Sequence, residues 1–522
     1  MAINSCKFFS QTESKYACFS FLLLCTILFT SLSAPAQKLS PKKMDAMVAR
    51  QMLPALEELK DYVSIPNDAV NPEDIQENVQ WAEKAFAKRG FQTSVLKNAR
   101  LPLFLAEMSF PKASKTVMFY FHLDGQPVRA DEWQQEDPFR MVLREKGADG
   151  AYEDINWNLL QSTINDEWRV FGRSSSDDKG PIIMLLQALD MLQSERQSPP
   201  FNIKVVLDPE EEKGSPGLKE TLEKHKDRFQ ADYLIVMDGP MHASNIPTLT
   251  LGCRGSVGFT LATYGPITPQ HSGHYGNYAP NPGFLLAKVI ASMKDEQGRV
   301  LVDGFYNGIA FDEEALKVMA AVPDNKEEIN ARLVIAEEEK VGNNYQESLQ
   351  YPSLNIRGMQ SAVVGKGAAT IVPDEAVALL DIRLVPETEA KRMVSLVDSH
   401  IQKQGYTVLN HAPTTEERLR YPQIVFMQSS GGTPAFRTDV NAPISVWLRK
   451  ALANSYKKEP VVIRMMGGTV PVVSFVQALD VPAVLVPLVN VDNNQHSPDE
   501  NLRLGNLRMG MKTCLSILTS PI

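Results

Sequence analysis

Three short apolar runs in the first half of the chain each end directly at acidic residues or at a histidine, and this repeated pattern constrains the fold most strongly. The runs, with the polar residues that follow them, are Thr116 to Phe121 before His122 and Asp124, Ile203 to Leu207 before Asp208 to Glu212, and Tyr233 to Met237 before Asp238. Apolar runs that alternate with helix-like segments are typical of an α/β domain with a largely parallel sheet. Ligands of such sheets bind beyond the carboxyl ends of the strands, so we expect these polar side chains to lie at one site.

The length of the chain predicts two domains. Of its 522 residues 43% are hydrophobic, which is enough apolar material for more than one core. The pattern changes at about Gly252 and resumes near Ala442. We therefore predict a mixed, largely parallel sheet flanked by helices, formed by residues 37–251 and 439–522, with an α/β domain inserted at residues 252–438.

The inserted domain is expected to contain antiparallel strands. Its predicted strands are Ser256–Tyr264, Ala376–Val385 and Tyr406–Ala412, and its predicted helices are Asn281–Met293 and Glu389–Gln404. No pattern assigns the segment from Lys294 to Gly367. Outside the insertion we predict helices at Pro41–Tyr62 and Ala442–Lys457, and strands at Pro471–Phe475 and Val481–Val489 that return to the first sheet.

The first 36 residues are predicted to be a signal peptide. Lys7 and Lys15 precede an apolar run from Ala17 to Leu32, and Ala34-Pro35-Ala36 offers a cleavage site between small residues. The alternative is an uncleaved anchor, for which this run is short and contains several Ser and Thr. No later stretch is long and apolar enough for a span, so we expect an exported protein, periplasmic or secreted, with no stable membrane span after cleavage.

Charge and cysteine content exclude two further classes of protein. The formal net charge is -9 and no basic stripe is present, so we expect no nucleic-acid partner. Cys253 and Cys514 are the cysteines left after signal removal, and two cysteines do not make a disulfide framework. The sequence leaves open whether they pair.

Five residues at predicted strand ends and in adjoining loops form a potential ligand set for two metal ions: His122, Asp177, Glu212, Asp238 and His496. Two divalent ions about 3.5 Å apart can activate a water and stabilise an oxyanion, which is what amide hydrolysis requires. Taken singly, each residue has an ordinary explanation, such as a helix N-cap at Asp177 or a turn at Asp238. Their joint occurrence favours the metal site.

The motifs around these residues resemble those of the zinc exopeptidase family, in the same order. They are Phe121-His122-Leu123-Asp124, Gly172-Arg173-Ser174-Ser175-Ser176-Asp177-Asp178-Lys179-Gly180, Glu211-Glu212-Lys213-Gly214-Ser215, Asp238 and His496. That family includes carnosinase-like dipeptidases, glutamate carboxypeptidases, aminoacylases and succinyl-diaminopimelate desuccinylase. The resemblance extends from about residue 45 to the C-terminus.

The resemblance implies a role for each motif residue. Asp177 would bridge two divalent ions, most simply Zn²⁺ although Mn²⁺ or Co²⁺ would also suit the ligands. His122 and Asp238 would complete one ion, and Glu212 and His496 the other. Glu211 would be the general base that takes a proton from a metal-bridging water. Asp124 would hold the second nitrogen of the His122 imidazole.

The inserted domain resembles the lid of that family, which in many members also forms the homodimer interface. The resemblance implies that His271 reaches the active site of a partner and that Arg383 grips the substrate carboxylate. Without that resemblance, His271 would be an ordinary loop residue and Arg383 a surface charge. Gly467, Gly468 and Thr469 would line the substrate site.

One motif departs from the dipeptidase branch. The carnosinase-like enzymes have Arg-Glu-Gly-Gly-Ser where this chain has Met465-Met466-Gly467-Gly468-Thr469. A wall of methionines would favour an apolar or uncharged substrate group, unless Arg464 compensates for the missing charge.

We therefore expect an exported metal-dependent exopeptidase of the dipeptidase or carboxypeptidase type that acts on small peptides. An N-acyl-amino-acid amidohydrolase or desuccinylase would use the same metals and base. A non-catalytic peptide-binding protein on the same fold is the alternative from another class.

Overall fold

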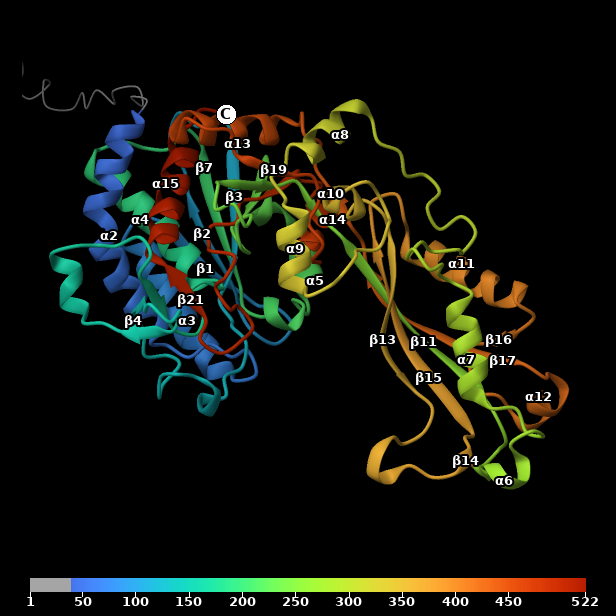
Figure 1. Cartoon of the computed structure of the whole chain (residues 1–522). Helices are drawn as coiled ribbons and strands as arrows, with labels where there is room; N and C mark the ends of the chain where they lie inside the picture. The colour runs from blue at the N-terminus through green and yellow to red at the C-terminus, as the bar shows by residue number, and fades with distance from the viewer. Residues whose placement is uncertain (1–38) are drawn as a thin grey trace, which may run out of the picture. The chain divides into compact units, whose positions relative to one another are not determined.

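The main sheet of the protein has eight strands and contains the three apolar runs noted above (Figure 1). The computed structural model describes residues 39–522, so the predicted signal peptide at residues 1–36 lies outside the described residues. In spatial order the strands are β1 (Gln92–Leu96), β2 (Leu103–Met108), β7 (Asn202–Asp208), β3 (Thr116–His122), β8 (Tyr233–Val236), β20 (Ala483–Leu485), β9 (Thr248–Thr250) and β19 (Val461–Ile463). The pairs β7–β3, β3–β8, β8–β20 and β9–β19 are parallel and the others are antiparallel, which confirms the predicted mixed, largely parallel sheet.

Alternate residues of the central strands enter two different cores, because successive side chains of a strand point to opposite faces. On β3, Phe119 and Phe121 join one core, whereas Met118 and Tyr120 join the other. The helices of the first core are α2 (Pro41–Val63), α3 (Pro72–Ala87), α4 (Lys179–Ser194), α13 (Pro443–Tyr456) and α15 (Leu504–Thr519). Those of the second are α5 (Leu218–Lys224), η4 (Lys226–Phe229) and α14 (Val473–Leu479). Helices therefore flank both faces of the sheet, as predicted.

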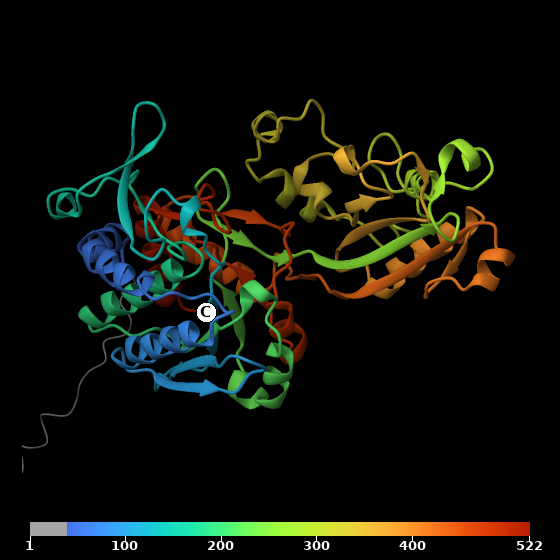
Figure 2. The same cartoon turned by 90° about the horizontal axis from the view of Figure 1, so that it is seen from below.

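A second sheet of five strands is built from residues between Gly255 and Thr433. Its order is β13 (Ser353–Gln360), β15 (Glu375–Leu384), β11 (Gly255–Tyr264), β17 (Ile424–Thr433) and β16 (Thr407–Leu409), with only the β16–β17 pair parallel. Figure 2 shows the long strand β11, in green, beside the orange β15. One face packs against α7 (Pro282–Ala291) and α11 (Ala390–Lys403) in a core of its own. This is the predicted α/β insertion with antiparallel strands; its action as a lid stays a prediction.

The ends of the insertion meet in a small ladder. β10 (Gly252–Cys253) pairs with β18 (Phe436–Arg437), close to the predicted limits of the inserted domain. The domain limits themselves stay a prediction.

Other short elements lie outside these sheets and cores. They are β12 (Gln270–His271), α6 (Ser272–Tyr275), η5 (Gly365–Gly367), β14 (Ile371–Val372), α12 (Thr415–Arg420), η1 (Ala130–Glu132), η2 (Trp157–Gln161) and η3 (Glu211–Lys213).

A four-stranded antiparallel sheet was not predicted from the sequence. Its order is β21 (Asn501–Arg503), β6 (Arg169–Phe171), β4 (Val142–Lys146) and β5 (Tyr152–Asp154). In this sheet Asn501 pairs with Phe171, so two segments that are far apart in the sequence become neighbours. The sheet thereby joins the segment before Asp177 to the segment after His496.

The segment that the sequence left unassigned contains three α-helices, the edge strand β13 and the short helix η5, and it contacts the main sheet. The α-helices are α8 (Glu313–Ala320), α9 (Lys326–Leu333) and α10 (Tyr345–Ser348). Helix α8 contacts β19, and Asp324 Oδ1 lies 3.1 Å from Nε2 of His242. Arg464 Nη1 donates to Gln350 Oε1 at 2.6 Å. Arg464 is therefore engaged with this segment.

The predicted strand at Pro471–Phe475 is wrong, because Val473–Leu479 forms helix α14. A short apolar run fits a buried strand and a buried helix equally well, and the tertiary contacts decide. Here Val473 and Phe475 are buried and the helix packs against α5. The left-handed Asp480 ends it.

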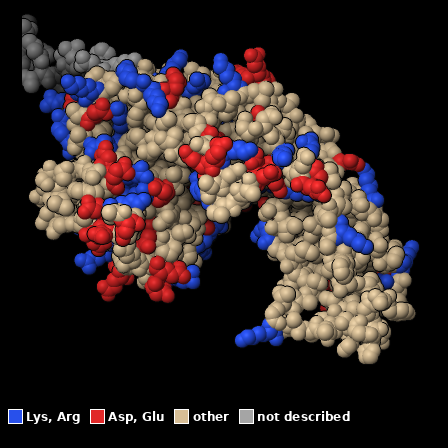
Figure 3. Space-filling view, viewed as in Figure 1, with Lys and Arg blue, Asp and Glu red and all other residues tan. Residues whose placement is uncertain are grey.

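The described residues also bear on the cysteines, on membrane spans and on the distribution of charge. Cys253 and Cys514 are both buried and free within residues 39–522, in two different cores, so they do not pair. Among the same residues, none of the helices combines the length and the apolar character that crossing a membrane requires. Figure 3 shows acidic and basic side chains interspersed over the left and upper parts of the viewed face and few of either at the lower right.

Candidate metal centre

Three neighbouring parallel strands bring the predicted catalytic side chains to one edge of the main sheet. β3 lies between β7 and β8, and the pairing of His122 with Asp208 aligns the carboxyl ends of β3 and β7. His122 is the last residue of β3, Glu211 and Glu212 follow β7, and Asp238 follows β8. The strand ends predicted from the three apolar runs are thus confirmed, and their polar residues share one site.

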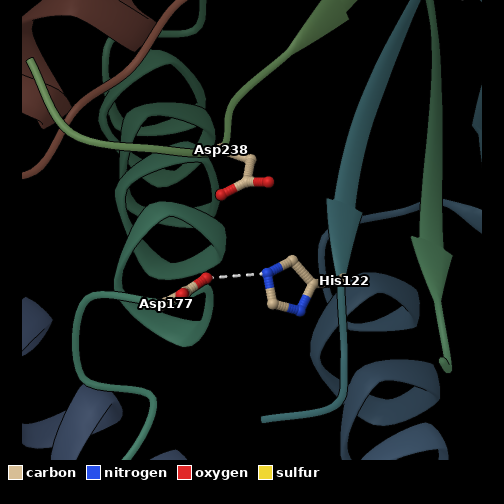
Figure 4. Close-up of side chains that lie close together, drawn as sticks. All are labelled: His122, Asp177 and Asp238. Carbon is tan, nitrogen blue, oxygen red and sulfur yellow. Dashed lines mark hydrogen bonds and ion pairs between the residues drawn. The ribbon is translucent and has the colours of Figure 1, made fainter. Parts of the chain in front are cut away.

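Two groups of three side chains could each hold an ion, and they share Asp177. His122, Asp177 and Asp238 offer ligand atoms within 4.8 Å of one another (Figure 4), and so do Asp177, Glu212 and His496. Asp177 directly precedes Asp178, the N-cap of α4, and accepts from His122 Nε2 at 2.8 Å through Oδ1. Its other oxygen lies 3.2 Å from His496 Nε2. The structure therefore brings together all five predicted ligands in the two predicted sets.

Asp124 lies at the second nitrogen of the His122 imidazole and contacts it mainly through its backbone. His122 Nδ1 donates to the backbone carbonyl of Asp124 at 2.9 Å, whereas the nearest carboxylate oxygen is 3.5 Å away. That carboxylate instead accepts the backbone N–H groups of Glu211 and Glu212, at 2.9 and 3.1 Å. Asp124 is fully buried, so it joins the turn after β3 to the turn after β7.

Carboxylates in this site repel one another in a buried setting. Burial, followed by repulsion from Asp177, raises the pKa of Glu212 to about 7 and that of Asp238 to about 6. Burial and the charges of Asp238 and Glu212 raise the pKa of Glu211 well above its usual value. Removing water disfavours the charged form, and each nearby anion adds to the effect.

The two histidines of the site interact electrostatically with these carboxylates. Burial lowers the pKa of His122, but its hydrogen bonds to Asp124 and Asp177 outweigh this and raise it well above its usual value. The hydrogen bond to Asp177 raises the pKa of His496, against burial. The same two histidines hold the pKa of Asp177 below its usual range although burial opposes this. The histidines and the carboxylates thus stabilise one another's charged forms, as a bound divalent cation would stabilise the carboxylates.

The donor set fits two divalent cations. Each group combines one imidazole nitrogen with carboxylate oxygens, a mixture that suits Zn²⁺, Mn²⁺ and Co²⁺. Asp177 presents one oxygen to each group, as a bridging carboxylate must. Burial raises the pKa values of Glu212 and Asp238 and repulsion from Asp177 adds to it, and a bound cation would oppose both effects.

Arg383 and Thr469, both predicted to bind substrate, contact each other. Arg383 Nη1 donates to Thr469 Oγ1 at 3.1 Å, and that hydroxyl donates to the backbone carbonyl of Arg254 at 2.7 Å. Arg383 remains partly exposed and its Nε lies 3.6 Å from Asp381. Arg383 therefore lies next to the Gly467-Gly468-Thr469 segment.

The two methionines and His271 are the other residues expected near the substrate. Met465 is fully buried, whereas Met466 is partly exposed and its backbone pairs with Gly252 and Arg254. The preference for an apolar or uncharged substrate group stays a prediction. His271 is exposed and its Nδ1 accepts the N–H of Gly273 at 3.0 Å. A role for His271 in a partner's site stays a prediction.

Sequence reasoning missed three residues that hold the site together. Gln126 Nε2 donates to Glu212 Oε2 at 2.6 Å. Asn67 is fully buried and donates to the carbonyl of Leu123 at 2.8 Å. Glu500, four residues after His496, is fully buried against the Asp177 segment. An acidic residue after Ser-Pro-Asp has the composition of a surface loop, so only the pairing of β21 with β6 reveals it.

Comparison with known proteins decides the family. A sequence model of peptidase family M20/M25/M40 matches residues 118–520, most of the chain. The chain belongs to this family. Membership confirms the resemblance inferred from the motifs and the prediction of a metal-dependent peptidase-type hydrolase.

Several relatives share most of their length with this M20/M25/M40 chain. Beta-Ala-His dipeptidase of Homo sapiens is 28% identical over 420 residues, covering 79% of this chain and 76% of its own length. Cys-Gly metallodipeptidase DUG1 of Candida albicans is 27% identical over 435 residues, covering 81% and 83%. The crystal structure of the metallo-carboxypeptidase Sso-CP2 from Sulfolobus solfataricus is similar with a TM-score of 0.71 at 27% identity, over 89% of this chain and 98% of that one.

Metal uptake should displace protons, since a histidine and two carboxyls with raised pKa values must be deprotonated to bind an ion. We expect the affinity for Zn²⁺ to rise from pH 6 to pH 8, by about tenfold per pH unit for each proton displaced. Below the raised pKa values the protons compete, and above them they no longer do. Calorimetry in two buffers of different ionisation enthalpy would count the protons.

The control is His411→Ala, which changes an exposed histidine that contacts Glu417. It should release the same number of protons as the unchanged protein, whereas His496→Ala should release fewer. Metal binding that is independent of pH over this range would contradict the electrostatic description of the site.

Proposed function

We propose that this M20/M25/M40 chain is a dinuclear-metal exopeptidase that cleaves dipeptides or other short peptides. The observation that carries the proposal is the pair of ligand groups that share Asp177, with Glu211 directly before the ligand Glu212. The dipeptidases named above, similar over about four-fifths of the chain, support peptides as the substrate class.

In this proposal Glu211 is the proton carrier. It accepts a proton from the attacking water and later donates it to the leaving amine nitrogen. Burial and neighbouring anions raise its pKa, which favours a group that can hold the proton between the two steps. Asp124 keeps Glu211 in place by accepting its backbone N–H at 2.9 Å. The bound divalent ions would supply Lewis-acid polarisation of the scissile carbonyl.

Substrate orientation would rest on Arg383 and the neighbouring glycines. Arg383 would bind the substrate carboxylate, for which it would exchange its hydrogen bond with Thr469. Gly467 and Gly468 permit close approach of the substrate backbone. His271 would complete the site from a second copy, so we also propose a homodimer formed through residues 252–438.

The proposal is tested with a mixed panel of dipeptides, tripeptides and N-acyl amino acids, incubated with Zn²⁺- or Mn²⁺-loaded protein and followed by mass spectrometry. We expect chelator-sensitive loss of the short peptides. Loss of only the acylated compounds would replace the proposal by an N-acyl-amino-acid amidohydrolase. Loss of none would indicate a peptide-binding protein on this fold.

Glu211→Gln should lower kcat by about 10²- to 10⁴-fold, because the amide cannot accept the proton. Metal content measured by plasma mass spectrometry should stay at two ions per chain, since Glu211 belongs to neither ligand group. Glu220→Gln is the control, as this exposed carboxylate on α5 undergoes the same chemical change. Unchanged turnover in Glu211→Gln would remove the residue from the mechanism.

We further propose export with cleavage after Ala36. The small-residue motif and the apolar run before it support this. The intact mass of protein recovered from the exported fraction should correspond to a chain that begins at Gln37. Light scattering of the same protein should give twice that mass in solution. A full-length chain in the membrane fraction would instead indicate an uncleaved anchor.

A further inference from the structure

The carboxylate of Glu500 is fully buried and accepts five hydrogen bonds from one short segment, residues 173–177. Its Oε1 accepts Ser176 N at 2.9 Å, Ser176 Oγ at 2.8 Å and Asp177 N at 2.9 Å, and its Oε2 accepts Ser174 N and Arg173 Nη1, both at 2.8 Å. The segment therefore wraps around this single side chain.

The wrapped segment ends at the shared metal ligand and contains backbone strain. Asp177 belongs to both ligand groups. Ser174 has a φ of 62°, a left-handed conformation that is costly for a residue with a side chain. Such strain persists only where surrounding contacts enforce it, and the bond from Ser174 N to Glu500 is one of these contacts.

Glu500 also belongs to the segment that contains the ligand His496. Its backbone carbonyl accepts Gly172 N at 3.0 Å, which extends the pairing of β21 with β6 by one residue. The next residue, Asn501, donates its backbone N–H to Asn493 at 2.8 Å and closes the loop that contains His496. One carboxylate thus joins two ligand-bearing loops that are 323 residues apart in the sequence.

The negative charge and both oxygens are needed. Arg173 is the buried cation that pairs with Glu500, and its guanidinium lies over the Trp133 ring, 5.1 Å from the centroid. The oxygens face three and two donors. An amide has one accepting oxygen, so a glutamine in either orientation turns N–H groups toward at least two donors. Shape alone cannot replace the carboxylate.

We propose that Glu500 is a positioning residue that sets the place of Asp177 for both metal ions, and that it does so through the backbone of residues 174–177. The inference rests on the proposed function, since it assumes two bound ions. Groups that orient metal ligands commonly change metal affinity by about 10- to 100-fold when they are replaced. A buried ion pair that served stability alone would leave the affinity unchanged.

Glu500→Gln tests this on the full mature chain. We expect both ions to bind about 10- to 100-fold more weakly in titrations with Co²⁺ followed by its visible absorption, because Asp177 is common to both groups. The Co²⁺ spectrum itself should change, since the coordination geometry shifts. A plain loss of stability would not produce that change.

The matched control is Glu58→Gln. Glu58 is a partly buried carboxylate that accepts from Lys88 and Arg89, at 3.3 and 2.7 Å, and also from Gln187, but none of its partners is a predicted ligand. It should lower the thermal unfolding temperature and leave Co²⁺ affinity and spectrum unchanged.

Glu500→Asp keeps the charge and both oxygens on a chain that is one methylene shorter, so it decides the question if Glu500→Gln does not fold. We expect about tenfold weaker Co²⁺ binding in this variant. Affinity and spectrum equal to the unchanged protein in either folded variant would overturn the inference, as would an equal loss in Glu58→Gln. If the unchanged protein itself takes up no pair of ions, the proposed function fails instead.

Discussion

The parallel hydrogen-bond ladder of β7, β3 and β8 is the constraint on which the rest of the structure depends. It sets His122 level with Asp208 and places the turn after β8 on the other side of β3. A shift of one residue in a strand would send every side chain to the opposite face. Phe119 and Phe121 would then leave the core that they share with α2, α4 and α15. Burial of apolar side chains thus fixes the register, and the register fixes the site.

The ladder brings several carboxylates close together at its carboxyl end. Surrounding residues hold these carboxylates in place. Asp177, Glu211, Glu212 and Asp238 lie close enough to raise the pKa values of three of the four. Two residues of the same kind keep this arrangement in place. Asp124 and Glu500 are fully buried carboxylates that accept backbone N–H groups next to the ligands. Because these two carboxylates bond to backbone N–H groups, the side chains of the ligands remain directed at the site.

Much of the fold and of the site could be predicted because the relevant information is local. The apolar runs before His122, Asp208 and Asp238 predict strands, and the rule for parallel sheets then predicts one site. What could not be predicted depends on contacts far apart in sequence. Short strands such as β6 and β21 have no pattern of their own, and α14 was mistaken for a strand. The carboxylate of Asp124 could be placed near His122 from spacing, but not its choice of backbone partners.

The pairing of β21 with β6 also affects when the site can form during synthesis of the chain. The bond from Arg173 to Glu500 joins residues 327 positions apart. During synthesis the chain acquires His122, Asp177, Glu212 and Asp238 long before His496 and Glu500. A growing chain can therefore gather one ligand group, while the other lacks its histidine and the Asp177 segment lacks the carboxylate around which it folds. The second ligand group becomes complete only when the segment with His496 and Glu500 has been made, so a chain that stops before it has only one of the two groups.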